Sequence, residues 1–218
     1  MINWQDINTV LLDMDGTLLD LHFDNHFWQH YLPTCYGKAN DLSIRASKQV
    51  LFAQFAQQAH KLNWYCVDFW SQQLGLDIVS LKRDVKDKIR FRPDTVAFLT
   101  ALKDKQIPRT LVTNAHPKAL DLKLEHTGLG GYLDHIFSSH QFGAPKESPD
   151  FWQRFQAQYR FDPAKTLLID DSVSVLNAAK DYGIGHLVAI ANPDSQLGSI
   201  PIQGFPAIHD FKEILPSE

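Results

Sequence analysis

Acidic side chains at the ends of apolar segments are the feature of this sequence with the most chemical content. Asp13 and Asp15 close one apolar run, and Asp170 and Asp171 close another. If both runs are strands of an open parallel sheet, their carboxyl ends lie at the edge where such sheets bind ligands. Four carboxylates gathered there would form part of one ligand-binding site.

Hydroxyl, amide and ammonium groups follow two further apolar runs. Thr113 and Asn114 end the third run, and Lys146 comes after the fourth. These groups can donate hydrogen bonds to an anion and offset the charge of nearby carboxylates. A lone Asp after a strand usually caps a helix. An ordered set of polar strand ends, spread over about 160 residues, instead indicates one converging site.

The elements that must position these groups alternate along the chain. Short apolar runs predict five buried strands at residues 7–13, 109–114, 135–139, 165–170 and 186–190. Helical patterns between them begin at Pro93, Pro117, Ser148 with Pro149, and Ser172. This alternation predicts an α/β fold, a Rossmann-like doubly wound parallel sheet with right-handed crossovers.

The segment between the first two predicted strands has a different character. Helical patterns cover Ser43–His60 and Asn63–Leu74, with Asn63 as a helix N-cap and Gly75 as a stop, and no strand-like run interrupts them. Aromatic residues are dense there and predict a core of their own. We therefore expect a core domain of residues 1–22 and 91–218, with an all-helical cap domain of residues 23–90 inserted after the first strand.

Composition excludes several classes of protein. The 218 residues carry a net charge of −4, which argues against a partner such as polymeric nucleic acid or a membrane surface. No apolar run is long enough to span a bilayer. The only cysteines, Cys35 and Cys66, form no CxxC pair, so a disulfide framework and a zinc site built of cysteines are not expected. We expect a cytoplasmic protein that is a monomer or a weak homodimer.

Two other metal-binding motifs do not fit the sequence. An EF-hand loop needs glycine at position six, but in the segment beginning at Asp13 glycine stands at position four. His22, His26 and His30 have helical spacing, yet a zinc protease motif needs Glu directly after the first His. Roles in packing, in solvent or at a pocket rim are favoured for these histidines over metal binding.

The polar strand ends resemble the motifs of the haloacid dehalogenase-like hydrolases. Asp13–Leu18 (DMDGTL) is similar to the nucleophile motif, Thr113–Ala115 to the second, Lys146 to the third and Ile169–Ser172 to the fourth. The segments LLDMDGTLLDL, NWYCVDFWSQQLGLDI, LVTNAHP, KLEHTGL and NPDS also resemble bacterial nucleotidases of this superfamily that act on GMP and IMP. The second segment lies in the predicted cap, so the likeness bears on substrate as well as fold.

The resemblance implies a role for each motif residue. Asp13 would be the nucleophile, Asp15 the general acid and base, and Lys146 the group that offsets the anionic charge. Thr113, Asn114, Gly16 and Thr17 would bind the phosphate or shape the loop beside it. Mg²⁺ would be the cofactor, and its ligands would be Asp13, the backbone carbonyl of Asp15, Asp170 and Asp171.

The function implied is Mg²⁺-dependent hydrolysis of phosphomonoesters through an aspartyl-phosphate, with IMP and GMP as the expected substrates. A phosphatase or phosphomutase for small phosphorylated metabolites is the alternative, and a non-catalytic protein that keeps the fold is a remote one. Asp15 favours phosphoester chemistry, because dehalogenases of the superfamily commonly lack it. In the cap we expect Trp28 and Trp64 to stack on the base and Asp24 or Asp68 to accept its N1–H.

Overall fold

A six-stranded parallel sheet forms the centre of the molecule in the computed structural model, which describes residues 2–216. The strand order is β3-β2-β1-β4-β5-β6. The strands are β1 (Thr9–Leu12), β2 (Arg109–Thr113), β3 (His135–Ser138), β4 (Thr166–Asp170), β5 (His186–Ile190) and β6 (Ala207–Ile208). Every adjacent pair is parallel. The predicted α/β fold class is confirmed, and β6 is a short strand that the sequence pattern did not reveal.

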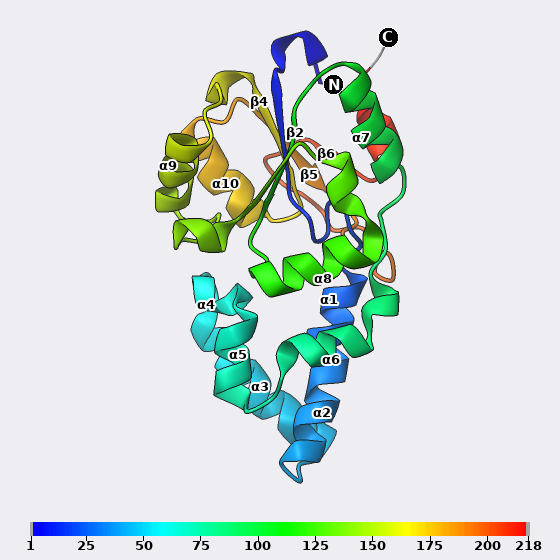
Figure 1. Cartoon of the computed structure of the whole chain (residues 1–218), viewed down its shortest axis with the longest axis vertical. Coiled ribbons are helices and arrows are strands. Elements are labelled where there is room, and N and C mark those ends of the chain that lie inside the picture. Colours follow the sequence, from blue (N-terminus) through cyan, green and yellow to red (C-terminus); the bar gives the residue numbers. More distant parts are fainter. Residues whose placement is uncertain (1, 217–218) are drawn as a thin grey trace.

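Helices cover both faces of the sheet (Figure 1). Helices α7 (Thr95–Asp104) and α8 (Pro117–Thr127) pack on one face, and α9 (Pro149–Gln158) and α10 (Val173–Tyr182) pack on the other. Alternate residues of β1 point to opposite faces of the sheet. Leu12 belongs to the apolar cluster under α7 and α8, Leu11 belongs to the cluster under α9 and α10, and both side chains are fully buried. A sheet buried on both faces explains why the strands read as continuous apolar runs.

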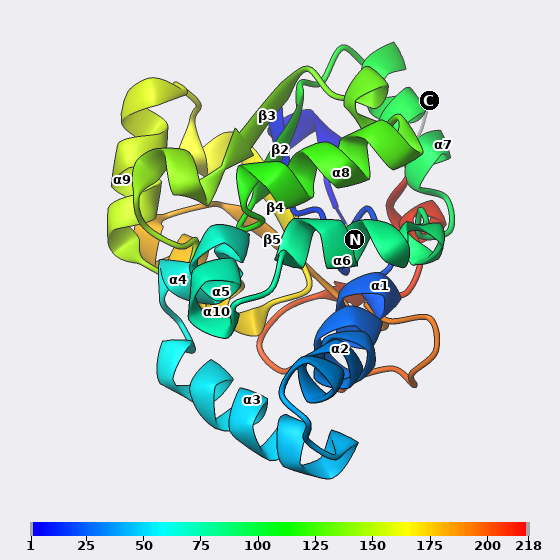
Figure 2. The ribbon, with the colours of Figure 1, turned by 60° about the horizontal axis from the view of Figure 1, so that its bottom comes forward.

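A group of helices lies between β1 and β2 in the chain and beyond the carboxyl ends of the strands (Figures 1 and 2). We call these the cap helices: α1 (His22–His26), a π-helical turn (Phe27–Tyr31), α2 (Leu32–Ala39), α3 (Ile44–Gln58), α4 (Leu62–Tyr65), α5 (Val67–Leu74) and α6 (Ile78–Asp84). The longest has 15 residues. In the described part of the chain, none of the helices has the length and apolar character that crossing a bilayer requires.

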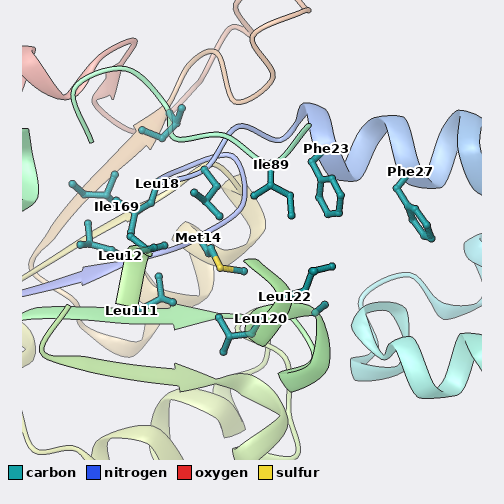
Figure 3. Packing of buried hydrophobic residues seen from close by; sticks show 14 of the residues in the cluster. Leu12, Met14, Leu18, Phe23, Phe27, Ile89, Leu111, Leu120, Leu122 and Ile169 are labelled. Atoms are coloured by element: carbon teal, nitrogen blue, oxygen red, sulfur yellow. The ribbon is translucent and has the colours of Figure 1, made fainter. Parts of the chain in front are cut away.

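Buried apolar residues connect the first cap helix to the sheet (Figure 3). Phe23 and Phe27 of α1 and the following turn belong to the same cluster as Leu12 in β1 and Met14 and Leu18 in the loop after it. All five have at most 1% of their surface exposed. Because burial of a large apolar side chain contributes roughly 1.5–3 kcal/mol, this cluster holds the base of the cap firmly against the sheet edge.

The predicted helix Asn63–Leu74 is wrong in one respect, because the structure divides it into α4 and α5 at Cys66. The backbone of Cys66 is extended, and its Sγ accepts a hydrogen bond from the backbone N–H of Phe69, so Cys66 and not Asn63 is the N-cap of α5. Gly75 ends α5 with a φ of 66°, as predicted. Because of this break, Cys66 lies between two helices and not within the one continuous helix that the sequence pattern predicts.

Candidate active site

Lys146 ties together the ends of two neighbouring strands. Its Nζ lies 2.5 Å from Asp13 Oδ1, 2.6 Å from Asp170 Oδ2 and 3.0 Å from the carbonyl oxygen of Val112. Asp13 follows β1, Asp170 ends β4, and these two strands pair directly. Lys146 is 1% exposed and Asp170 also 1%, so a charged triad stands in the protein interior.

The carboxylates around Lys146 carry more negative charge than one ammonium group can offset. Burial raises the pKa of Asp13 to about 6, against the opposing influence of Lys146. Burial together with the charges of Asp13 and Asp170 raises the pKa of Asp171 well above its usual range. Carboxylate oxygens of Asp13, Asp170 and Asp171 lie within 4.8 Å of one another. Three carboxylates facing one ammonium group form an oxygen-only set that fits a small hard cation such as Mg²⁺.

Asp15 has a different ionic partner from Asp13. Its Oδ1 lies 2.6 Å from Nζ of Lys123, which α8 carries into the site. Burial raises the pKa of Asp15 to about 6, although Lys123 opposes the shift. The two aspartates of the first loop are therefore held by two separate lysines, and this separation lets them play different chemical roles.

Lys123 also belongs to a buried row of alternating charges, Lys123, Asp24 and Lys82, which the sequence did not predict. It lies 2.6 Å from Asp24 Oδ2, and Lys82 of α6 lies 2.6 Å from Asp24 Oδ1. Although burial alone would raise it, the two lysines hold the pKa of Asp24 well below its usual range. Both oxygens of Asp24 are thus engaged by lysines, and we do not retain the expectation that it reads a base. The one available signal was Lys123 in the segment KLEHTGL.

Thr113 and Asn114 line the same cavity as the acidic groups. The Thr113 hydroxyl accepts a hydrogen bond from the backbone N–H of Ala115 at 3.0 Å, so its own proton is free to donate. Asn114 Oδ1 accepts from the backbone N–H of Lys146 at 2.9 Å, which fixes the loop that carries the lysine. Thr17, by contrast, is fully buried and outside the cavity lining, so its side chain is not placed to touch a phosphate.

Gly16 permits a close approach between the first loop and Asp171. Its φ is +86°, and a Cβ at this position would lie 2.5 Å from Asp171 Oδ2. Gly16→Ala should therefore displace the Asp171 carboxylate and lower kcat by about 10²-fold or more, the usual effect of misplacing a reacting group by an ångström.

Gly204→Ala is a matched control for this substitution. Gly204 also has a φ of +86°, but a Cβ there would meet nothing within 4 Å. The two variants share the backbone strain and differ in the clash with Asp171. Steady-state rates and thermal melts of both are compared. If the two lose activity equally, the contact with Asp171 has no catalytic importance.

A cavity of about 640 Å³ extends from the acidic groups to the cap helices. At its inner end are Asp13, Asp15 and Lys146, and on the cap side Trp28 and Trp64 are part of its wall. Further aromatic residues there are Phe52, Phe55 and Trp70. Trp28 packs edge-on against Trp70, and Trp64 is 37% exposed. Polar groups of the core and aromatic surfaces of the cap therefore face one shared space.

Asp68, the remaining cap residue predicted to contact substrate, lies elsewhere. Its side chain is half exposed and accepts two hydrogen bonds from Nζ of Lys118, at 2.7 and 2.9 Å. It is absent from the cavity lining. The expectation that Asp68 reads the base is therefore dropped, because its carboxylate is paired on the surface with a core lysine.

A hydrogen-bonded contact joins cap and core beside Lys146. The Tyr65 hydroxyl donates to Glu147 Oε1 at 2.5 Å, and Asn114 Nδ2 donates to Glu147 Oε2 at 2.9 Å. Burial and the Glu147 charge both raise the pKa of Tyr65, so the phenol stays a donor. The sequence did not predict this contact, because Tyr65 and Glu147 lie 82 residues apart in the chain.

His22, His26 and His30 stack along one side of the first cap helices. The successive ring centroids are 5.9 Å apart. In the described part of the chain, two groups of side chains are close enough to hold a metal ion, and neither includes these histidines. The roles in packing, in solvent or at a pocket rim that the sequence favours for these histidines stay predictions.

Comparison of the sequence with known proteins gives a consistent result. The sequence model of the haloacid dehalogenase-like hydrolases matches residues 7–183. The GMP/IMP nucleotidase YrfG of Escherichia coli is 44% identical over 216 residues, covering 99% of this chain and 97% of the nucleotidase. The match therefore includes the cap helices as well as the sheet.

Solved structures share the fold. The HAD phosphatase of Thermococcus onnurineus superposes with a TM-score of 0.76 at 23% identity, covering 95% of this chain and 96% of the phosphatase. A magnesium-bound structure of the HAD-type hydrolase YfnB of Bacillus subtilis superposes with a TM-score of 0.65 at 18% identity, covering 95% and 96% of the two chains. At 23% and 18% identity, these two structural matches establish the fold alone.

Proposed function

Because this chain belongs to the haloacid dehalogenase-like hydrolases and is a phosphatase-type enzyme, we propose that it hydrolyses purine nucleoside 5′-monophosphates, IMP and GMP above all. The observation that carries this proposal is the cavity shared by the Asp13 carboxylate and the aromatic wall of the cap helices. Residues 23–90 would act as the cap domain and residues 1–22 and 91–218 as the core. The substrate class draws further support from the 44% identical nucleotidase.

Asp13 would act as the nucleophile. A carboxylate oxygen attacks phosphorus, the new O–P bond forms, and the bond to the leaving oxygen breaks, giving an aspartyl-phosphate. Lys146 lies 2.5 Å from Asp13 and offsets the charge that accumulates as the dianion approaches. The free proton of Thr113 is available to a phosphoryl oxygen. Mg²⁺ held by Asp13, Asp170, Asp171 and the backbone carbonyl of Asp15 would supply the remaining positive charge.

Asp15 would donate the proton that the leaving oxygen needs and then accept one from the attacking water. That water attacks the aspartyl-phosphate, the Asp13–phosphorus bond breaks, and inorganic phosphate leaves. With its pKa raised to about 6, Asp15 changes protonation near neutrality, which suits a group that must act as both acid and base. Lys123, 2.6 Å away, holds the carboxylate in place.

Replacement of Asp15 by Asn is expected to lower kcat by about 10²–10⁴-fold on nucleotides. The loss should be smallest for an aryl phosphate, because a phenolate leaves with little help from an acid. Phosphate release from both substrate types measures the difference. An equal loss on nucleotide and aryl ester would count against the acid role.

The aromatic wall of the cavity would bind the base. Stacking of a base on an aromatic side chain contributes roughly 1–3 kcal/mol, and Trp28 and Trp64 offer the surfaces. Small phosphate esters such as phosphoglycolate or sugar phosphates have no flat ring to fill this wall, which is why we rank them, and a phosphomutase, second. The structure suggests no single base-reading side chain, since both predicted aspartates are paired with lysines.

A phosphate-release panel tests the proposed function. The panel contains IMP, GMP, AMP, phosphoglycolate, a hexose phosphate and an aryl phosphate, each with Mg²⁺ and with EDTA. We expect the highest kcat/KM for IMP and GMP. EDTA should abolish phosphate release, and added Mg²⁺ should restore it. Trp64→Leu should lower kcat/KM for IMP and GMP by about 10-fold and spare the aryl ester. Preference for a non-nucleotide, or indifference to EDTA, would overturn the substrate or the metal assignment respectively.

A further inference from the structure

Three side chains with metal-binding atoms meet where the cap helices touch the core. Cys66, at the break between α4 and α5, comes from the cap side, and His116, before α8, and His140, in the short helical turn Ser139–Phe142, come from the core. One ligand atom from each lies within 4.8 Å of the others. In a tetrahedral zinc site such atoms are separated by about 3.3–3.6 Å, so modest side-chain rotation would bring them to bonding positions.

The donor atoms of this cluster have the chemistry that a zinc site requires. Burial, then the neighbouring His116, lowers the pKa of His140 to about 4, and burial also lowers the pKa of His116. Both imidazoles are therefore neutral at physiological pH, the form that binds metal. Nε2 of His140 is buried and has no hydrogen-bond partner among residues 2–216. This buried nitrogen, beside a thiol and a second imidazole, has a bonding capacity that the described residues leave unused.

We propose that Cys66, His116 and His140 form a binding site for Zn²⁺, separate from the catalytic carboxylates, with a water molecule as the fourth ligand. A thiolate with two imidazoles selects a borderline-soft ion, whereas the oxygen-only set of Asp13, Asp170 and Asp171 selects Mg²⁺. The site combines one cysteine with two histidines that lie far apart in the sequence and match no short metal-binding motif.

Neighbouring charges support this site. Asp68 Oδ2 lies 3.7 Å from Nε2 of His116, and Lys118 holds Asp68 in place through two hydrogen bonds. A carboxylate beside one ring nitrogen orients an imidazole that binds metal through its other nitrogen. The ion would therefore bind at Nδ1 of His116 and would replace the 3.4 Å hydrogen bond that this nitrogen accepts from the backbone N–H of Lys118.

Zinc at this position would fasten the cap helices to the core. Cys66 follows Tyr65, whose hydroxyl already donates to Glu147, and His116 lies two residues after Asn114, which also donates to Glu147. A bound ion would add bonds from metal to both sides of that contact. Substrate entry and product release need the cap to separate from the core, so occupancy by Zn²⁺ should slow turnover.

The direct test measures metal binding by the full chain without turnover. Zn²⁺ is titrated against a chromogenic chelator in the presence of excess Mg²⁺, and Co²⁺ is used as a spectroscopic substitute that reports thiolate ligation by its near-ultraviolet absorption. Variants are Cys66→Ser, which keeps a hydrogen-bond acceptor for the Phe69 N–H, and His140→Gln. Cys35→Ser replaces the other free cysteine and is the matched control, and Asp170→Asn reports on the carboxylate set. Circular dichroism and thermal melts show that each variant is folded.

We expect one equivalent of Zn²⁺ to bind to the wild type, to Cys35→Ser and to Asp170→Asn. Cys66→Ser and His140→Gln should bind at least about 10–100-fold more weakly and lose the thiolate absorption or its ligand-field pattern. Absence of binding to the wild type, or undiminished binding to both site variants, overturns the proposal. Loss of binding in Asp170→Asn alone would overturn it too, because the ion would then occupy the carboxylate set.

Kinetics tests the consequence for the cap. One equivalent of Zn²⁺ should inhibit phosphate release by the wild type and by Cys35→Ser and leave Cys66→Ser unaffected. Equal inhibition of Cys66→Ser would show that zinc does not inhibit by joining the cap helices to the core. Because the binding experiment needs no substrate, its outcome is independent of the proposed nucleotidase function.

Discussion

The Asp13→Asn variant is expected to lose at least about 10⁴-fold in kcat, in line with removal of other covalent nucleophiles. Asparagine has nearly the shape of aspartate, but its amide cannot form the acyl phosphate. The substitution also removes one buried carboxylate from a site in which burial raises the pKa of Asp13, Asp170 and Asp171. The folded variant should therefore be at least as stable as the wild type while being almost inactive.

Single-turnover phosphate release and acid-quench trapping of a phosphorylated protein check this result. Wild type should give a labile phosphoprotein with a labelled substrate, and Asp13→Asn should give none. Asp181→Asn, on the exposed side of α10, serves as the control for the chemical change itself and should retain full activity. Residual turnover of Asp13→Asn above a trace, once deamidation back to aspartate is excluded by mass spectrometry, would mean that Asp13 is not the nucleophile.

The Lys146→Met variant should be impaired in both catalysis and stability. Loss of the ammonium group leaves the developing charge at phosphorus without a preorganised partner, so kcat should fall by about 10²–10³-fold even at saturating substrate. Asp13 and Asp170 also lose the cation that lies 2.5 and 2.6 Å from them. Removing one partner of a buried ionic group typically lowers the free energy of unfolding by about 3–5 kcal/mol.

The pH dependence of this loss has a definite sign. Without Lys146 the folded-state pKa values of Asp13 and Asp170 rise further above their unfolded values, so the folded protein favours the protonated acids. The variant should come closest to wild-type stability below about pH 4, and the deficit should grow as the pH rises through 6. Urea unfolding at pH 5 and pH 8 measures it, with exposed Lys165→Met as the control. Mg²⁺ should recover part of the lost stability, and a deficit that shrinks with rising pH would contradict this account.

The sequence by itself predicted the first five strands of the sheet and the polar groups at its edge, but not the short strand β6. Runs such as Lys165–Asp170 are apolar because a parallel sheet is buried on both faces, and this pattern is local enough to read from one sequence. Parallel strands bring their carboxyl ends to one edge whatever lies between them, so the sequence predicts that Asp13 and Asp170 lie at the same edge of the sheet. The direct pairing of β1 with β4, which makes them neighbours, is seen only in the structure. The resemblance of the motifs then supplied the expected chemistry.

Only the tertiary structure decided which groups pair across the boundary between cap helices and core. Lys123 and Asp24 are 99 residues apart, and Lys82 and Asp24 are 58 apart, yet both pairs are in contact at 2.6 Å. Cys66 left the predicted helix pattern because the chain breaks there, and only then does it face His116 and His140. Such contacts produce no periodic pattern in the sequence, because they depend on how the cap helices are oriented against the core. That orientation is set by the buried surface and the charges along the whole boundary between them.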